Sequence, residues 1–254
     1  MAGDGPGDVE KESMSSPSRI LLPLDFDNAK QAVEIASVIH SEIAGFKVGL
    51  ELINAAGFDI FDKLKQASGW DVPIFYDCKL HDIPNTVAGA AKAIAKRGVW
   101  MVNVHASGGF QMMLSAVDAS RDAAEKRPLV IAVTVLTSIS EDIARNEVGI
   151  EKPLSEHVVS LARMAQDAGC DGVVASPREA AAIRAACGSD FLLVIPGVRP
   201  AGADLNDQKR VLTPGDAVRQ GADYIVVGRP ITAAPDPLAA ARAINNETAE
   251  AMER

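Results

Sequence analysis

The chain has 254 residues, of which 48% are hydrophobic, and a formal net charge of −9 at pH 7. This length is enough for a large core and is the usual size of a one-domain (β/α)8 barrel. The negative charge argues against nucleic acid or an anionic membrane surface as a partner. An anionic small molecule would need a local basic site.

The cysteines and histidines indicate neither disulfides nor a metal site. Cys78, Cys170 and Cys187 have no paired spacing, so we expect buried thiols in a reducing compartment such as the cytoplasm. The four histidines lack the HxH and HExxH spacings of metal ligands. Apolar runs such as residues 129–136 have the length of strands, so we expect no membrane span.

Residues 1–18 are rich in glycine, serine, proline and charge, and they contain no apolar core of a secretion signal. We expect a disordered tail here. From residue 19 onward, short apolar runs alternate with helical patterns to the end of the chain, and no change of composition marks a second domain. We therefore expect one domain over residues 19–254.

The first two predicted strands each carry a charged residue. Residues 20–25 form an apolar run that ends in Asp25, and residues 28–40 follow with helical periodicity. Asp25 is as suitable for capping that helix as for binding a ligand. Residues 44–49 predict a second strand that contains Lys47, and a lysine in such an apolar strand needs an anionic partner.

The third predicted strand begins at residue 73 as an apolar, aromatic run and then carries Asp77 and Lys79, with Asp82 beyond them. Residues two apart on a strand share a face, so Asp77 and Lys79 should point the same way. Pro84 ends the extended segment before a helix of small residues. A surface salt bridge is the ordinary interpretation. An acid–base–acid set at a buried strand end would lose solvation without a clear gain in stability, which favours function.

Five more strands follow with the same alternation, at residues 100–105, 129–136, 172–175, 191–195 and 224–227. Helices are expected at residues 109–125, 154–168, 177–186 and 214–220, and from 236. Eight strands that alternate with helices predict an α/β fold with a parallel sheet, a (β/α)8 TIM barrel, because a doubly wound sheet of this length would have fewer strands. The long polar connection at residues 138–153 could fold over an active site.

The later strand ends supply further candidates, namely Thr137 and Ser140, then Arg199, then Gly228 and Arg229. In a barrel all strand ends converge on one mouth. Glycine lets the backbone approach a ligand closely, and a guanidinium binds phosphate through two hydrogen bonds. Because barrels often hold phosphate after strands seven and eight, we expect a phosphate site at Gly228 and Arg229.

These motifs together resemble the bacterial type of orotidine 5'-phosphate decarboxylase, from Ile20 to about Ala243. The resemblance implies decarboxylation of orotidine 5'-phosphate to UMP, the last step of de novo pyrimidine biosynthesis, without metal or cofactor. The matching segments are Asp-x-Lys-x-x-Asp-Ile-Pro-Asn-Thr at 77–86 and residues 24–25, 46–49, 136–138, 196–200, 207–208 and 227–230.

The resemblance also implies roles for single residues. Lys47, Asp77, Lys79 and Asp82 would form an alternating charge network, with Lys79 as the proton donor. Asp82 would come from the partner subunit of a homodimer, together with Ile83 and Thr86. The remaining implied contacts are Asp25 and Lys47 to ribose, Thr137 and Ser140 to the pyrimidine, and Gln208, Gly228, Arg229 and Arg199 to the phosphate.

Two other functions compete with this one. Phosphosugar decarboxylases and synthases of the same superfamily use magnesium, but they carry an acid where this chain has Lys47. A non-catalytic nucleotide-binding barrel would be expected to have lost a member of the charged set, and here every member is present. An absorbance assay with orotidine 5'-phosphate, with and without EDTA, would discriminate these possibilities.

Overall fold

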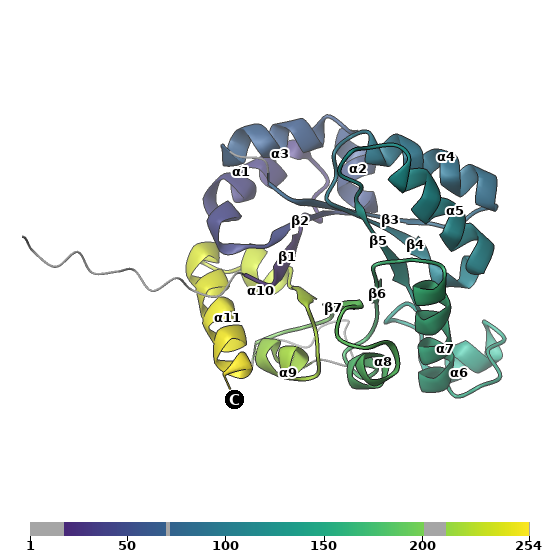
Figure 1. Cartoon of the computed structure of the whole chain (residues 1–254). Coiled ribbons are helices and arrows are strands. Elements are labelled where there is room, and N and C mark those ends of the chain that lie inside the picture. Colours follow the sequence, from purple (N-terminus) through teal and green to yellow (C-terminus); the bar gives the residue numbers. More distant parts are fainter. Residues whose placement is uncertain (1–17, 70–71, 201–211, 254) are drawn as a thin grey trace, which may run out of the picture.

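The computed structural model describes residues 18–69, 72–200 and 212–253, so the expected disordered tail lies, apart from Ser18, outside the described residues. Eight parallel strands pair in chain order, and β1 pairs with β8 as well as with β2, which closes the barrel (Figure 1). The expected (β/α)8 TIM barrel is confirmed. The strands are β1 Ile20–Pro23, β2 Gly45–Val48, β3 Ile74–Leu80, β4 Met101–His105, β5 Leu129–Val133, β6 Gly172–Val174, β7 Leu192–Pro196 and β8 Tyr224–Val226.

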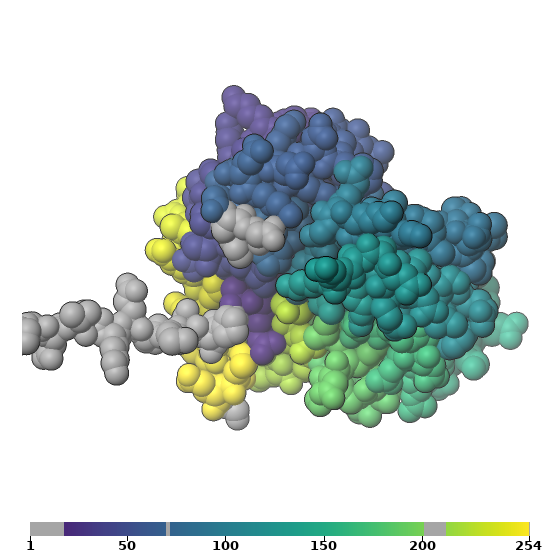
Figure 2. Space-filling view, turned by 45° about the horizontal axis from the view of Figure 1, so that its top comes forward, coloured from purple at the N-terminus to yellow at the C-terminus, as the bar shows by residue number. Residues whose placement is uncertain are grey.

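The helices surround this ring of strands (Figure 1). They are α1 Ala29–Ile39, α2 Leu50–Ala56, α3 Ile60–Ser68, α4 Pro84–Ala95, α5 Phe110–Arg121, α6 Glu141–Asn146, α7 Leu154–Asp167, α8 Ala180–Cys187, α9 Pro214–Arg219, α10 Arg229–Thr232 and α11 Pro237–Met252, with 3-10 turns η1 His40–Glu42 and η2 Ala106–Gly108. Helix α11 contacts α1 and η1, so the last element packs against the first ones (Figure 2). None of the helices in the described part of the chain combines the length and apolar character needed to cross a membrane.

Alternation along the strands creates two cores. One cluster fills the barrel interior and consists of Leu21, Phe75, Met101, Ile131 and Val194. The other lies between strands and helices, and β3 contributes Ile74 and Tyr76 to it. Each large side chain that is fully buried contributes about 1.5–3 kcal/mol. Because Phe75 points inward, Asp77 two residues later also points inward, at the mouth of the barrel.

Several element ends differ from the sequence-based expectation. Strand β5 stops at Val133 instead of residue 136, because Val135, Leu136 and Thr137 all line the cavity and therefore no longer alternate. Helix α5 ends at Arg121 instead of residue 125. The connection at 138–153 contains the short helix α6.

Pro84 both ends the extended segment and begins α4. At the first helical position the missing N–H of proline removes no hydrogen bond, so proline is well tolerated there.

Candidate active site

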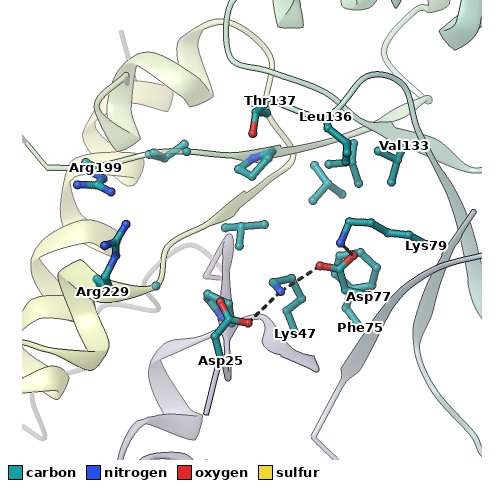
Figure 3. A pocket seen from close by; sticks show the side chains of 18 of the residues that line it. Asp25, Lys47, Phe75, Asp77, Lys79, Val133, Leu136, Thr137, Arg199 and Arg229 are labelled. Atoms are coloured by element: carbon teal, nitrogen blue, oxygen red, sulfur yellow. Dashed lines mark hydrogen bonds and ion pairs between the residues drawn. The ribbon is translucent and has the colours of Figure 1, made fainter. Parts of the chain in front are cut away.

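A cavity of about 380 Å³ opens at the carboxyl ends of the strands, and its size suits a small-molecule site. Strand ends that are far apart in the sequence line this cavity together (Figure 3). It brings together most of the side chains predicted from the sequence, namely Asp25, Lys47, Asp77, Lys79, Thr137, Arg199, Gly228 and Arg229.

Four charged side chains alternate in sign along the cavity wall. Lys47 Nζ lies 3.5 Å from Asp25 Oδ1 and 3.0 Å from Asp77 Oδ2. Lys79 Nζ donates a hydrogen bond of 2.6 Å to Asp77 Oδ1. The side chains of Lys47 and Asp77 are each 11% exposed, so the predicted need of Lys47 for an anionic partner is met twice.

The sequence left two roles open for Asp25, a helix cap or a ligand contact, and the structure decides between them. Asn28 caps α1, because its side chain accepts a hydrogen bond from the backbone N–H of Gln31. Asp25 instead forms the ion pair with Lys47 at the cavity.

Asp77 is an anion throughout the neutral range. Burial by itself raises the pKa of its carboxyl group, but the charges of Lys47 and Lys79 and hydrogen bonds from Lys79 and Asn103 outweigh burial and lower the pKa to about 2. A fixed carboxylate therefore lies between two ammonium groups, and the side chain of Lys79, which lines the cavity, is 31% exposed. Such a site can oppose a negative charge on a ligand and can deliver a proton next to it.

Strand β3 is not regular where Asp77 and Lys79 lie. Its register against β4 shifts between Tyr76 and Leu80. Lys79 has φ +50°, in the left-handed region that residues other than glycine rarely adopt. Asp77 and Lys79 do share a side, as predicted, and the partly buried Cys78 packs against the outer core. The prediction was right in its result, but a bulged strand rather than simple alternation produces it.

Asn103 on β4 holds this irregular segment and was missed in the sequence. Its Oδ1 accepts a hydrogen bond of 2.7 Å from the backbone N–H of Lys79, and its Nδ2 donates one of 2.7 Å to Asp77 Oδ1. A signal was available, because Asn103 lies in the apolar run Met-Val-Asn-Val-His. The argument that singled out Lys47 also applies here, since a buried polar side chain needs partners.

Two arginines lie at the opposite end of the cavity from Asp77 and Lys79 (Figure 3). Arg199 follows β7, and Arg229 is the first residue of α10 after β8. Their guanidinium groups make this end suitable for an anion. Gly228 has a packing role in addition to the predicted one, because a Cβ atom there would lie 2.9 Å from Pro23 Cγ.

Of the remaining predicted residues, those that the structure describes are not among the residues that line this cavity. Asp82, Ile83 and Thr86 are exposed beyond the end of β3, and Asp82 Oδ1 accepts a hydrogen bond from the backbone N–H of Ile83. Ser140 caps α6 by accepting a hydrogen bond from the N–H of Ile143, and it is not among the described residues that line the cavity. Gln208 lies outside the described residues.

The described part of the chain offers no cluster of metal-ligand side chains. Among residues 18–69, 72–200 and 212–253, no group of three or more His, Cys, Asp or Glu side chains is arranged to hold a metal ion. The acids of the cavity, Asp25 and Asp77, are instead paired with lysines.

Comparison with known proteins places these features in a family. The model of the "Orotidine 5'-phosphate decarboxylase / HUMPS family" matches residues 18–244. The chain is 50% identical to an orotidine 5'-phosphate decarboxylase of Moorella thermoacetica over 92% of this chain and 93% of the relative. It is 51% identical to one of Halorhodospira halophila over 94% and 99%.

Solved structures agree with this assignment. The crystal structure of an orotidine 5'-phosphate decarboxylase from Lactobacillus acidophilus is similar with a TM-score of 0.80 and 44% identity, covering 92% of this chain and 99% of that one. The corresponding protein of Pyrococcus horikoshii has a TM-score of 0.70 at 30% identity, covering 90% and 98%.

Proposed function

The chain belongs to the orotidine 5'-phosphate decarboxylase / HUMPS family, and on this premise we propose that it decarboxylates orotidine 5'-phosphate to UMP in pyrimidine biosynthesis. The observation that carries the proposal is the chain of contacts from Asp25 through Lys47 and Asp77 to Lys79 along the cavity wall. The names of the similar proteins support the same substrate.

The two ends of the cavity suit the two ends of this substrate. We assign the phosphate to Arg199 and Arg229 with Gly228, and the pyrimidine to the side of Asp77 and Lys79. Asp25 and Lys47 lie between these ends, which suits contact with the ribose hydroxyls (Figure 3). Thr137, on the wall formed after β5, suits contact with the base.

Decarboxylation of this substrate requires electrostatic stabilisation by the site. Loss of CO2 from the C6 carboxylate leaves the electron pair of the broken C–C bond on C6 as an sp2 carbanion that no part of the pyrimidine delocalises, so the site must stabilise negative charge and supply a proton. We assign the proton to Lys79, whose ammonium group Asp77 holds at 2.6 Å. Asp77 itself would face the carboxylate of the substrate and disfavour the ground state.

Charge repulsion alone is too small for such a reaction. Two like charges about 3 Å apart interact by roughly 5 kcal/mol at an effective dielectric constant near 20. Enzymes lower reaction barriers by roughly 8–23 kcal/mol. Binding of the distant phosphate must therefore contribute, because interactions with a remote group can be used to hold the reacting group in place.

We further propose a homodimer with shared active sites, in which Asp82, Ile83 and Thr86 of one subunit reach the cavity of the other. The exposed position of these residues, outside their own cavity, supports this, and Ile83 is an apolar side chain that is 66% exposed. In the same proposal residues 19–254 form the catalytic domain, Gln208 adds to the phosphate site and Ser140 to the pyrimidine site. The three free cysteines support a reducing, cytoplasmic location.

The proposal includes no metal or cofactor and no nucleic-acid or membrane partner. Its test is the absorbance change of orotidine 5'-phosphate with the purified protein, with and without EDTA. We expect equal turnover in both, because a lysine, Lys47, stands where the magnesium-dependent phosphosugar enzymes carry an acid. Activity that is lost in EDTA and restored by magnesium would reject the metal-free mechanism. Binding of the nucleotide without turnover would favour a non-catalytic barrel.

A further inference from the structure

Asn103 is fully buried in β4 and contacts three consecutive residues of β3. Its side-chain oxygen accepts from the N–H of Lys79, its side-chain nitrogen donates to Asp77 Oδ1, and its backbone oxygen lies 3.6 Å from Cys78 Sγ. It does not line the cavity, so any effect on a ligand must pass through Asp77 and Lys79.

We propose that Asn103 is a positioning residue for the decarboxylation, which holds the Lys79 backbone in its left-handed conformation and aims the Asp77 carboxylate at the Lys79 ammonium. The inference rests on the proposed function, because it assigns the reaction to these two side chains.

The register between β3 and β4 leaves the Lys79 backbone outside the regular ladder. Tyr76 pairs with Val102 and Leu80 pairs with Val104, so the β3 segment between those pairs is longer than the β4 segment that faces it. The additional residues of β3 cannot use the regular ladder. Lys79 lies in this segment at φ +50°, and its N–H finds an acceptor in the Asn103 side chain. Without that acceptor, nothing in the neighbouring strand would favour the unusual conformation over a relaxed one.

The two oxygens of the Asp77 carboxylate face different cations. Asp77 Oδ2 lies against Lys47, and Oδ1 accepts from both Lys79 and Asn103. The bond from Asn103 therefore fixes the rotation of the carboxylate and keeps one oxygen at the Lys79 ammonium. Asparagine meets both demands because its amide has a donor and an acceptor side by side.

Two substitutions separate positioning from simple packing. Asn103→Leu keeps a similar volume but removes both hydrogen bonds. Asn103→Asp keeps an acceptor for the Lys79 N–H but puts a second carboxyl against Asp77. Thr134→Val is the matched control, because Thr134 is also buried, directly after the end of β5, and its hydroxyl donates a hydrogen bond to the Val174 oxygen, yet it does not line the cavity.

For Asn103→Leu we expect kcat to fall by about 10²-fold, which is the loss typical of a reacting group misplaced by about 1 Å. The affinity for UMP, measured by calorimetry, should not change, because the arginine end of the cavity is untouched. Thr134→Val should keep the wild-type kcat. Circular dichroism and thermal unfolding show whether each variant is folded.

For Asn103→Asp we expect kcat to depend on pH in a way that the kcat of the wild type does not. Two adjacent carboxyl groups share one proton at low pH, and that proton restores the donor toward Asp77. The kcat should therefore approach the wild-type value at low pH and fall as pH rises through this new ionisation. The other charged or titratable side chains near this place, Lys47, Lys79, His81 and His105, are present in both proteins, so the comparison isolates the carboxyl group introduced at position 103.

A folded Asn103→Leu variant with wild-type kcat would overturn the inference, as would an Asn103→Asp profile parallel to that of the wild type. If Asn103→Leu does not fold, Asn103→Asp decides; if neither folds, Asn103 serves folding and the inference is rejected. Failure of the wild type itself to convert orotidine 5'-phosphate would instead reject the proposed function, so the two failures are distinguishable.

Discussion

Lys79 donates a 2.6 Å hydrogen bond to Asp77 two residues earlier on the same strand, across a segment whose register against β4 is shifted. In a regular strand, the side chains of residues two apart leave the same face at a separation of roughly 6.6 Å. The left-handed backbone at Lys79 changes the direction of its side chain and closes the pair. The donor–acceptor pair of Asp77 and Lys79 thus forms within the bulged segment, at the wall of the cavity.

Replacement of Lys79 by alanine should lower turnover by at least about 10²-fold, the usual minimum when a general acid is removed. The fold should persist, because only the mouth of the barrel is changed. Turnover of orotidine 5'-phosphate by the folded variant is the measurement, and Lys30→Ala, on an exposed part of α1, is the control. Retention of more than about a hundredth of the activity would contradict Lys79 as proton donor.

Replacement of Arg229 by alanine should raise KM for the nucleotide about 10- to 100-fold, because a hydrogen bond to a charged group contributes about 1.5–3 kcal/mol. Turnover of orotidine, which has no phosphate, should change little. Arg199→Ala is the comparison at the same end of the cavity. Equal losses on nucleotide and nucleoside would show that Arg229 does not bind the phosphate.

The shared site can be tested by mixing inactive chains. In a dimer of Lys79→Ala with Asp82→Ala, one site combines native Lys79 with native Asp82, and the other site carries both defects. Random pairing makes about half of the dimers mixed, so activity should recover to about a quarter of the wild type. No recovery, with subunit exchange demonstrated by a labelled chain, would mean that Asp82 acts within its own barrel.

The stability of the protein should depend on Asp77 in acid. The pKa of this carboxyl group is lowered from 3.8 to about 2 in the folded state, so the unfolded chain binds the proton more readily. Asp77 therefore stabilises the fold above about pH 4, and this contribution, of the order of 2 kcal/mol, is lost as pH falls from about 4 to about 2.

The measurement is reversible unfolding by urea at a series of acidic pH values, for the wild type and Asp77→Asn. The wild type should lose free energy of unfolding faster than the variant over this range, because the variant has no carboxyl group to protonate. Parallel loss in the two proteins would mean that Asp77 is not held as an anion by Lys47 and Lys79.

Local sequence patterns were sufficient for the fold class. Short apolar runs alternating with helical periodicity predict parallel strands and crossover helices, and the structure has these elements in that order. Element ends were less predictable. Leu136 is as apolar as the residues of β5, yet it lies beyond the end of the strand, because the chain turns there to line the cavity. The hydrophobicity of a residue therefore does not show whether the backbone at that position still runs along the strand.

The candidate site, too, could be predicted from the sequence only in part. Lys47 could be recognised from the sequence alone, since an ammonium group in an apolar strand needs an anion wherever that anion comes from. Its pairing with both Asp25 and Asp77 follows only from closure of the barrel, which brings the ends of β1, β2 and β3 together. The hydrogen bond from the Lys79 backbone N–H to the Asn103 side chain depends on the register of β4 against a bulged β3. Residue types reveal which groups need partners, whereas the distances between segments remote in the chain are decided by how the strands pair.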